Sequence, residues 1–494
     1  MTSQGDNVDL STVQRVHLIA ICGVAMAAMA GMLKQRGYQV SGSDENVYPP
    51  MSMLLERWGI PIRTGFRAEN LSDRPDVVVV GNKVSRDNPE VQALLASDTP
   101  YLSLPQALHD FFLAGKRSIV VAGTHGKTTS TAMLAWVLER AGRDPSMMVG
   151  GDAKDFGGNF KLGAGEHFVL EGDEYDTAFF DKGPKFLHYA PQALILTAVE
   201  FDHADIYRDL DHVKSAFRKL IAILPAGAPL AVAADFPHAL EVAHREGLTP
   251  ETFGLSDAAR WRIANLRAAN GESSFEIVRG GGVECTATLR VPGAINARNA
   301  LGVYVLARRL GLRSDEILPG LRSFTGVARR QELVGEFNGI ALIDDFAHHP
   351  TAVAGSIAAI RQHYPGRRLW AVFEPRSNTS RRKVFQREYV DAFAAADRVI
   401  IGGVFQKQTD AVSADELFSP DQLASNLNAR GIKARAYPEI ETIVVGLTRN
   451  AKPGDVILLM SNGSFGGLRE KLAAALGGSA SSPSPSGPSG KAPR

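Results

Sequence analysis

Residues 118–142, SIVVAGTHGKTTSTAMLAWVLERAG, constrain the fold more than any other stretch of the sequence. The apolar run at 119–122 is typical of a buried strand, and apolar residues recur at helical spacing from 133 to 138. Between them lie a glycine loop and the expected start of a helix: Gly123, Thr124, His125, Gly126, Lys127, Thr128 and Thr129. Glycines let backbone N–H groups approach phosphate oxygens, and a helix N-terminus favours negative charge. The stretch therefore predicts a loop that binds a nucleoside triphosphate.

Two side chains of this stretch suit phosphate chemistry. Lys127 would neutralise charge on the β- and γ-phosphates, and the Thr128 hydroxyl would ligate Mg²⁺. The match to the full phosphate-loop pattern is incomplete, because that pattern has glycine at the position of Val121. The alternative is a glycine-rich turn before a helix with no ligand.

Composition sets the broad class of protein. A chain of 494 residues is too long for one core, so we expect two to four domains. The net charge of +1 indicates neither nucleic acid nor a membrane surface as partner. Two distant cysteines, Cys22 and Cys285, do not suggest a disulfide framework, and a reducing cytoplasm fits. The apolar run at 18–33 is short for a membrane span. It is also a poor signal peptide, because the acidic residues Asp6 and Asp9 precede it in place of a basic cluster.

The fold class expected is α/β, with three domains each built on a mainly parallel sheet. Residues 1–108 show strand patterns at 16–21 and 76–81, typical of a Rossmann-like domain. Its first loop lacks the G-x-G-x-x-G fingerprint, because Ala25 and Ala28 stand at the second and third glycine positions.

Residues 109–323 form the predicted central domain with the phosphate loop. Acidic residues follow or end one apolar strand: Glu171, Asp173, Glu174 and Asp176. A second strand delivers Glu200, Asp202, His203 and Asp205. Carboxylates at neighbouring strand ends beside a phosphate loop favour Mg²⁺, while a solvated turn is the alternative for the first set. Asn296 and Asn299 share one face of a further expected helix, where they could equally be a polar helix start.

Residues 324–476 again alternate strands and helices, which indicates a Rossmann-like third domain. One short loop holds Asp344, Asp345, His348 and His349, a weak pattern for a metal site because no outside ligand is evident. A basic group after a strand suits carboxylate binding or a solvated helix face: Arg376, Arg381, Arg382 and Lys383. The Ser/Pro/Gly-rich residues 477–494 predict a disordered tail.

Taken together, these motifs resemble the Mur ligase family, the ATP-dependent enzymes that add amino acids to the muramyl peptide of bacterial cell walls. GTHGKTT at 123–129 is similar to the family's phosphate loop, Glu171 to its Mg²⁺ ligand, and His203 to its invariant histidine. Asn296 and Asn299 are similar to the asparagines near the nucleotide base. Arg330 and Asp345 are similar to the arginine and aspartate that the C-terminal domain closes over ATP.

The resemblance implies a function more specific than the residues alone do. SGSD at 41–44 and DNPE at 87–90 look like the branch that acts on UDP-N-acetylmuramate. EGDEYD, FEPRSNTS and MSNGSFGG are similar to members that take the tripeptide L-alanyl-γ-D-glutamyl-meso-diaminopimelate. The reaction implied is amide-bond formation through an acyl phosphate, with ATP and Mg²⁺, in peptidoglycan recycling. Addition of L-alanine to the same acceptor is the runner-up, and a non-catalytic sensor of UDP-muramyl nucleotides and ATP is the alternative from another class.

Site residues follow from the same resemblance. The catalytic and metal-binding set is Lys127, Thr128, Glu171, His203 and, as a candidate base, His348. The expected UDP-sugar residues are Gly23, Ser43, Asp44 and Asn82. The expected peptide-binding residues are Arg376, Ser377, Asn378 and Arg381. We expect a cytoplasmic monomer or weak homo-oligomer.

Overall fold

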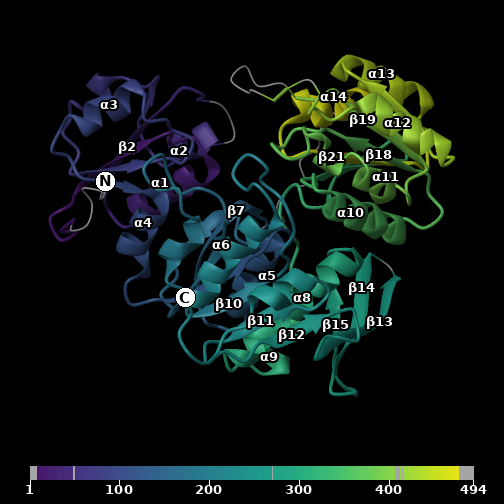
Figure 1. Cartoon of the computed structure of the whole chain (residues 1–494), viewed down its shortest axis with the longest axis horizontal. Helices are drawn as coiled ribbons and strands as arrows, with labels where there is room; N and C mark the ends of the chain where they lie inside the picture. The colour runs from purple at the N-terminus through teal and green to yellow at the C-terminus, as the bar shows by residue number, and fades with distance from the viewer. Residues whose placement is uncertain (1–7, 48–50, 270, 406–411, 414, 478–494) are drawn as a thin grey trace, which may run out of the picture. The chain divides into compact units, whose positions relative to one another are not determined.

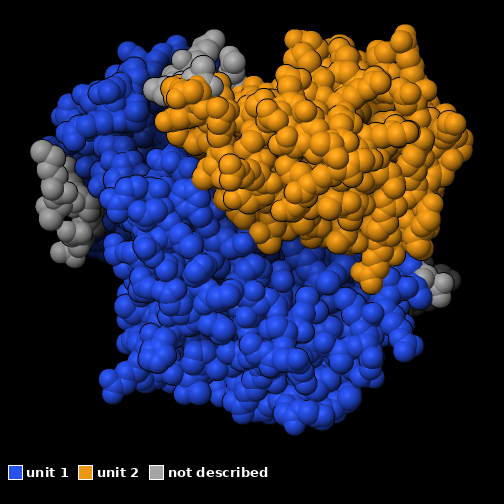
Figure 2. Space-filling view, turned by 45° about the vertical axis from the view of Figure 1, so that its right-hand side comes forward, with its two compact units in different colours: residues 1–328 blue, residues 329–494 orange. Residues whose placement is uncertain are grey.

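The computed structural model describes residues 8–47, 51–269, 271–405, 412–413 and 415–477. The chain divides into two compact units, residues 1–328 and 329–494 (Figure 2). The described residues form three sheets, two in the first unit and one in the second (Figure 1). The expected α/β class with three mainly parallel sheets is confirmed. The predicted disordered tail lies outside the described residues, apart from Gly477.

The first sheet is wholly parallel and has the strand order β3-β2-β1-β4-β5. Its strands are β1 Arg15–Ile19, β2 Gln39–Asp44, β3 Ile62–Thr64, β4 Val77–Val80 and β5 Tyr101–Ser103. Its helices are α1 Val24–Gln35, α2 Met51–Arg57, α3 Pro89–Leu95 and α4 Leu104–Leu108. All four valines of β4 are buried, as expected for a strand covered on both faces. The apolar run at 18–33 therefore folds as the end of β1 and most of α1.

The second sheet has ten strands in the order β15-β14-β13-β12-β11-β10-β6-β9-β7-β8. They are β6 Arg117–Ala122, β7 Ser146–Ala153, β8 Gly158–Lys161, β9 His167–Gly172, β10 Ala193–Leu196, β11 Leu230–Ala233, β12 Glu251–Gly254, β13 Trp261–Ala269, β14 Glu272–Arg279 and β15 Gly282–Leu289. Its helices are α5 Lys127–Arg140, α6 Leu210–Ala222, α7 Pro237–Val242, α8 Gly293–Arg309 and α9 Ser314–Ser323. The middle of the sheet is parallel, and antiparallel pairs close both ends.

The third sheet lies in the second unit and has the order β16-β17-β21-β18-β19-β20. Its strands are β16 Glu332–Phe337, β17 Ile340–Asp345, β18 Leu369–Phe373, β19 Arg398–Gly402, β20 Lys433–Tyr437 and β21 Val456–Met460. Its helices are α10 Pro350–His363, α11 Glu388–Ala392, α12 Pro420–Ala429, α13 Ile440–Asn450 and α14 Leu468–Ala475. Only β16 runs antiparallel, and a separate apolar cluster fills each face.

One boundary differs from the sequence expectation. The third domain was expected to begin at 324, but residues 324–328 belong to the first compact unit. Val327 forms an isolated bridge with Ala153, and the Thr325 hydroxyl donates to Asp155 at 2.8 Å. No helix among the described residues has the length and apolar character needed to cross a membrane.

Candidate active site at the phosphate loop

The predicted phosphate loop joins β6 to α5, and β6 lies between β10 and β9 inside the ten-stranded sheet. Two of its glycines have positive φ, 134° at Gly123 and 80° at Gly126. A Cβ on Gly123 would lie 2.3 Å from Thr197 Oγ1, and one on Gly126 would lie 2.6 Å from Asn299 Oδ1. The side chains of Thr197 and Asn299 thus pack closely against the loop. The glycines are required by both conformation and space.

Gly126→Ala is expected to weaken nucleotide binding by at least about a hundredfold, because the new Cβ would displace Asn299 and distort the loop. Gly142→Ala is the matched control: its φ is 72°, but nothing lies within 4 Å of the added Cβ. That variant should lose about 1 kcal/mol of stability and bind nucleotide normally. Calorimetric titration with an ATP analogue measures both affinities. Equal binding by the two variants would contradict the prediction.

Lys127 is the first residue of α5, and its side chain folds back over the loop. Its Nζ donates to Gly123 O at 2.7 Å and to Glu174 Oε2 at 2.8 Å. Burial alone would lower the pKa of Lys127, but the charges of Glu174 and Asp173 raise it. The ammonium is therefore held charged beside the loop, where a phosphate would bind.

Glu174 is a site residue that the sequence did not single out. It belongs to the acidic set for which a solvated turn was the alternative, yet only 2% of its side chain is exposed. It contacts Lys127, and Glu174 Oε1 lies 3.4 Å from His203 Nε2. Burial alone would raise its pKa, but these two cations lower the pKa of Glu174 to about 2. The solvated-turn interpretation is wrong for this residue.

The pKa of His203 is shifted in the opposite direction to that of Glu174. Burial alone would lower its pKa, but the hydrogen bond to Glu174 and the charge of that carboxylate raise the pKa of His203 to about 9. The residue also has a positive φ of 54°, and its ring lies 5.3 Å from that of Tyr175, measured between centroids. In this structure His203 therefore faces Glu174. To act as a metal ligand through Nε2 it would first have to lose its proton.

The His203 shift predicts a pH dependence of stability. The folded pKa lies above the ordinary value of 6.5, so the His203–Glu174 pair contributes fully below pH 6.5 and is lost as pH rises through about 9. In buffer without divalent cations, the wild type should lose about 2 kcal/mol more than His203→Gln between about pH 6 and pH 10. Urea denaturation at several pH values measures this difference. Parallel pH profiles for the two proteins would contradict it.

A candidate Mg²⁺ site lies beside the loop. Glu171, near the end of β9, accepts from the Thr128 hydroxyl at 2.7 Å and from Gly150 N–H at 2.7 Å. Burial, with the nearby charge of Asp173, raises the pKa of Glu171 despite the opposing charge of Lys127. A hydroxyl and a buried carboxylate are oxygen ligands of the kind Mg²⁺ prefers, and a cation would relieve the cost of ionising Glu171. Thr128 and Glu171 therefore fit a Mg²⁺ ion.

The opposite side of the loop is fixed by the segment after β10. His125 Nε2 lies 2.8 Å from Glu200 Oε2, and Glu200 N–H donates to Thr124 Oγ1 at 2.9 Å. The Thr124 N–H donates to Ala198 O at 2.9 Å. Residues about 75 positions apart in the sequence thus hold one another in place. The sequence placed Glu200 at a strand end but did not predict this partner.

Asn296 and Asn299 both lie in the first turns of α8 and are buried. Asn299 packs against Gly126, so the structure brings it to the phosphate loop. The Asn296 amide donates to Pro292 O at 2.8 Å, at the start of the helix.

The four expected UDP-sugar residues lie at one edge of the first sheet. Gly23 precedes α1, Ser43 and Asp44 end β2, and Asn82 follows β4. The order β2-β1-β4 makes this the carboxyl edge at the point where the strand order reverses, where open α/β sheets bind ligands. Asp44 accepts from Cys22 N–H at 2.9 Å.

In the second unit, Asp345 ends β17 and is buried. Its two oxygens accept from Ala347 N–H and from the Ser356 hydroxyl, both at 2.8 Å. Arg330 stacks on the Phe346 ring, 4.7 Å from its centroid. Asp344 instead pairs with Arg329 at 3.1 Å. The two carboxylates of this loop thus bind different partners and do not form a shared metal site.

His348 and the basic group lie near the carboxyl ends of β17 and β18. His348 Nδ1 lies 3.0 Å from Phe346 O. Because a carbonyl only accepts, Nδ1 carries a proton and Nε2 is the basic nitrogen of the neutral ring. Arg376 stacks on Phe405, 3.8 Å from the ring centroid.

The remaining expected peptide residues shape their own loop. Arg381 is only 2% exposed and donates to Asn378 Oδ1 at 3.0 Å. The Ser377 hydroxyl donates to Ser380 Oγ at 2.9 Å. Arg381 is therefore buried and stabilises this turn, and it is not exposed to solvent.

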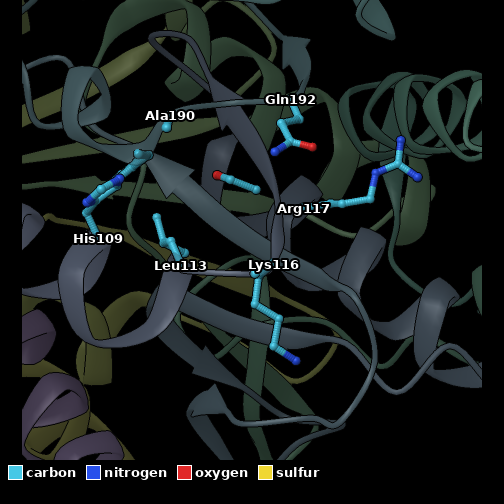
Figure 3. A pocket seen from close by; sticks show the side chains of 9 residues that line it. His109, Leu113, Lys116, Arg117, Ala190 and Gln192 are labelled. Atoms are coloured by element: carbon cyan, nitrogen blue, oxygen red, sulfur yellow. The ribbon is translucent and has the colours of Figure 1, made fainter. Parts of the chain in front are cut away.

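A separate cavity of about 420 Å³ lies at the amino end of β6 (Figure 3). Lys116, Arg117 and Gln192 line it. Lys116 Nζ donates to Gly163 O at 3.0 Å. Since the phosphate loop follows the carboxyl end of β6, this cavity is not part of the candidate active site.

Three family models match almost the whole described chain. Residues 15–116 match "Mur ligase family, catalytic domain", residues 121–307 "Mur ligase middle domain", and residues 329–463 "Mur ligase, glutamate ligase domain".

Curated relatives and a solved structure agree with these matches. UDP-N-acetylmuramate--L-alanyl-gamma-D-glutamyl-meso-2,6-diaminoheptandioate ligase of Escherichia coli is 38% identical over 459 residues, 93% of this chain and 97% of that protein. UDP-N-acetylmuramate--L-alanine ligase of Clostridium tetani is 32% identical over 460 residues, 92% and 97% of the two chains. The crystal structure of a murein peptide ligase from Psychrobacter arcticus has a TM-score of 0.68 and 32% identity, covering 94% and 99% of the two chains. With matches of this extent, the chain belongs to the Mur ligase family.

Proposed function

We propose that the chain is an ATP-dependent ligase that joins UDP-N-acetylmuramate to L-alanyl-γ-D-glutamyl-meso-diaminopimelate in peptidoglycan recycling. The activity named for the Escherichia coli relative, which is 38% identical over 93% of the chain, supports the substrates. The observation that carries the chemistry is the phosphate loop, where Lys127 is held charged beside Thr128 and Glu171. Cytoplasmic location and a monomer or weak homo-oligomer are part of the proposal.

In the first step, the lactyl carboxylate of UDP-N-acetylmuramate attacks the γ-phosphorus of ATP, giving an acyl phosphate and ADP. Two anions must approach each other, so their charges need neutralising. Lys127 supplies one positive charge at the loop. Thr128 and Glu171, with His203 after loss of its proton, would hold Mg²⁺, which supplies further charge stabilisation when bound.

In the second step, the amine of the tripeptide attacks the acyl carbon and phosphate leaves, so the amine must lose a proton. His348 is our candidate base, because its Nε2 is the basic nitrogen in the tautomer fixed by Phe346 O. Arg330 and Asp345 are proposed to complete the ATP site, and Asn296 and Asn299 to lie near the base of ATP. Arg376, Ser377 and Asn378, supported by Arg381, would receive the peptide carboxylates.

We assign the UDP-sugar to the carboxyl edge of the first sheet, at Gly23, Ser43, Asp44 and Asn82. With the boundary at 328, that division gives three functional domains: 1–108 for the UDP-sugar, 109–328 for ATP and 329–476 for the peptide. Asp44 already orders the turn at Cys22. Because this turn is not glycine-rich, other backbone groups near Cys22 would have to bind the diphosphate.

The test is phosphate release from ATP with UDP-N-acetylmuramate present, comparing the tripeptide with L-alanine as acceptor. Turnover with the tripeptide and none with L-alanine is the expected result. The reverse would make the chain an L-alanine ligase, a candidate favoured by the relative that is 32% identical over 92% of the chain. Binding of both nucleotides without turnover would identify a sensor, and phosphate release without any amine would identify a nucleotide-hydrolysing switch.

A further inference from the structure

The second unit has a cationic cavity of about 400 Å³ at the amino ends of β18, β19 and β20. Its charged lining residues are Arg361, Arg367, Arg368, Asp397, Arg398 and Lys433. Asp345 and Arg376 lie toward the carboxyl ends of β17 and β18, and a five-residue strand is about 13 Å long. The cavity is thus at the other edge of the sheet from the proposed peptide and ATP residues.

Three of the arginines are fixed by partners within the unit. Arg361 donates to Asp397 at 2.5 Å and to Arg367 O at 2.8 Å. Arg368 makes a two-pronged contact with Asp455, at 3.0 Å and 2.5 Å. Arg367 donates to the carbonyl oxygens of Gly454 and Asp455, both at 2.8 Å. The cavity wall is therefore held in place before any ligand binds.

The other two cations lie side by side. Arg398 and Lys433 are paired in register at the first positions of β19 and β20, so their side chains leave the same face of the sheet. Arg398 stacks on Trp370, 5.3 Å from the ring centroid. Within the described ranges, the ion pairs include neither Arg398 nor Lys433. Like charges on neighbouring strands repel, so an anion between them would be stabilised.

From this arrangement we infer that the cavity binds a small molecule with two adjacent phosphate groups. Guanidinium groups bind phosphate oxygens with two parallel hydrogen bonds, and two neighbouring cations match two neighbouring negative charges. A volume of about 400 Å³ is in the range of small-molecule sites and larger than one ion needs. The site is independent of the proposed ligase reaction.

The test uses inorganic pyrophosphate, titrated calorimetrically into the full chain carrying Lys127→Ala so that the phosphate loop contributes little. Saturable binding is expected, weakened about tenfold by Lys433→Gln and further by adding Arg398→Gln. Lys471→Gln is the control: this lysine pairs with Glu441 on the surface of the same unit and should leave affinity unchanged. Because Arg398 packs on Trp370, the exposed Lys433 variant keeps the test valid if Arg398→Gln fails to fold.

Absence of binding at millimolar pyrophosphate would overturn the inference. So would equal weakening by Lys433→Gln and Lys471→Gln, which would indicate nonspecific attraction to positive charge. A parallel titration with ADP, counted only as the binding that Lys433→Gln weakens, separates the two sources of the group. Tighter binding of ADP supports a nucleotide ligand, and equal or weaker binding supports recognition of the diphosphate alone.

Discussion

Replacing Lys127 with alanine is expected to lower kcat for phosphate release by about a thousandfold. The lysine is the charged group held at the loop, 2.7 Å from Gly123 O, where the phosphates of ATP are proposed to bind. UDP-N-acetylmuramate affinity should stay within about twofold, because its proposed site is on the first sheet, formed by other strands. Phosphate release and calorimetric titration with the UDP-sugar measure the two quantities.

Lys219→Ala is the matched control for this variant. Lys219 is an exposed residue of α6 in the same unit, so its loss changes the net charge equally without touching the loop. Its kcat should equal that of the wild type. Loss of UDP-sugar binding in a folded Lys127→Ala protein would contradict the division of labour between the sheets.

Glu174→Gln is expected to lower the free energy of unfolding by about 3 kcal/mol at neutral pH. The substitution keeps the size of the side chain but removes the negative charge that faces both Lys127 and His203. Only 11% of the Lys127 side chain is exposed, so water cannot replace the lost partner fully. Urea denaturation measures the change.

The control for this second variant is Glu241→Gln. Glu241 also contacts two cations, Lys214 and Arg218, but it is 43% exposed, and surface pairs contribute little. Its effect should stay below about 0.5 kcal/mol. Equal stability losses in the two variants would show that burial does not decide the strength of the Glu174 contacts.

Much of the fold could be predicted from local sequence patterns. The phosphate loop was predictable because strand, glycines and helix follow one another directly, and positive φ at Gly123 and Gly126 is a local requirement. Runs such as the valines of β4 predicted parallel strands, because a continuous apolar run is typical of a strand that is buried on both faces. The antiparallel pairs at the ends of the central sheet were not predicted, because which strands pair there depends on residues outside each strand.

The sequence by itself determined the family, the α/β class and the residue types that suit phosphate and Mg²⁺. Only the tertiary structure decided which acid meets which cation. Glu171 and Glu174 are three residues apart, yet one accepts from Thr128 and the other pairs with Lys127 and His203. The sequence could not separate them, because their roles depend on β9 lying beside β6 and on the path of the chain after each strand. Burial raises the pKa of both carboxyl groups, but only Glu174 has two cations close enough to overcome this effect, so the pKa of Glu174 is lowered while that of Glu171 is raised.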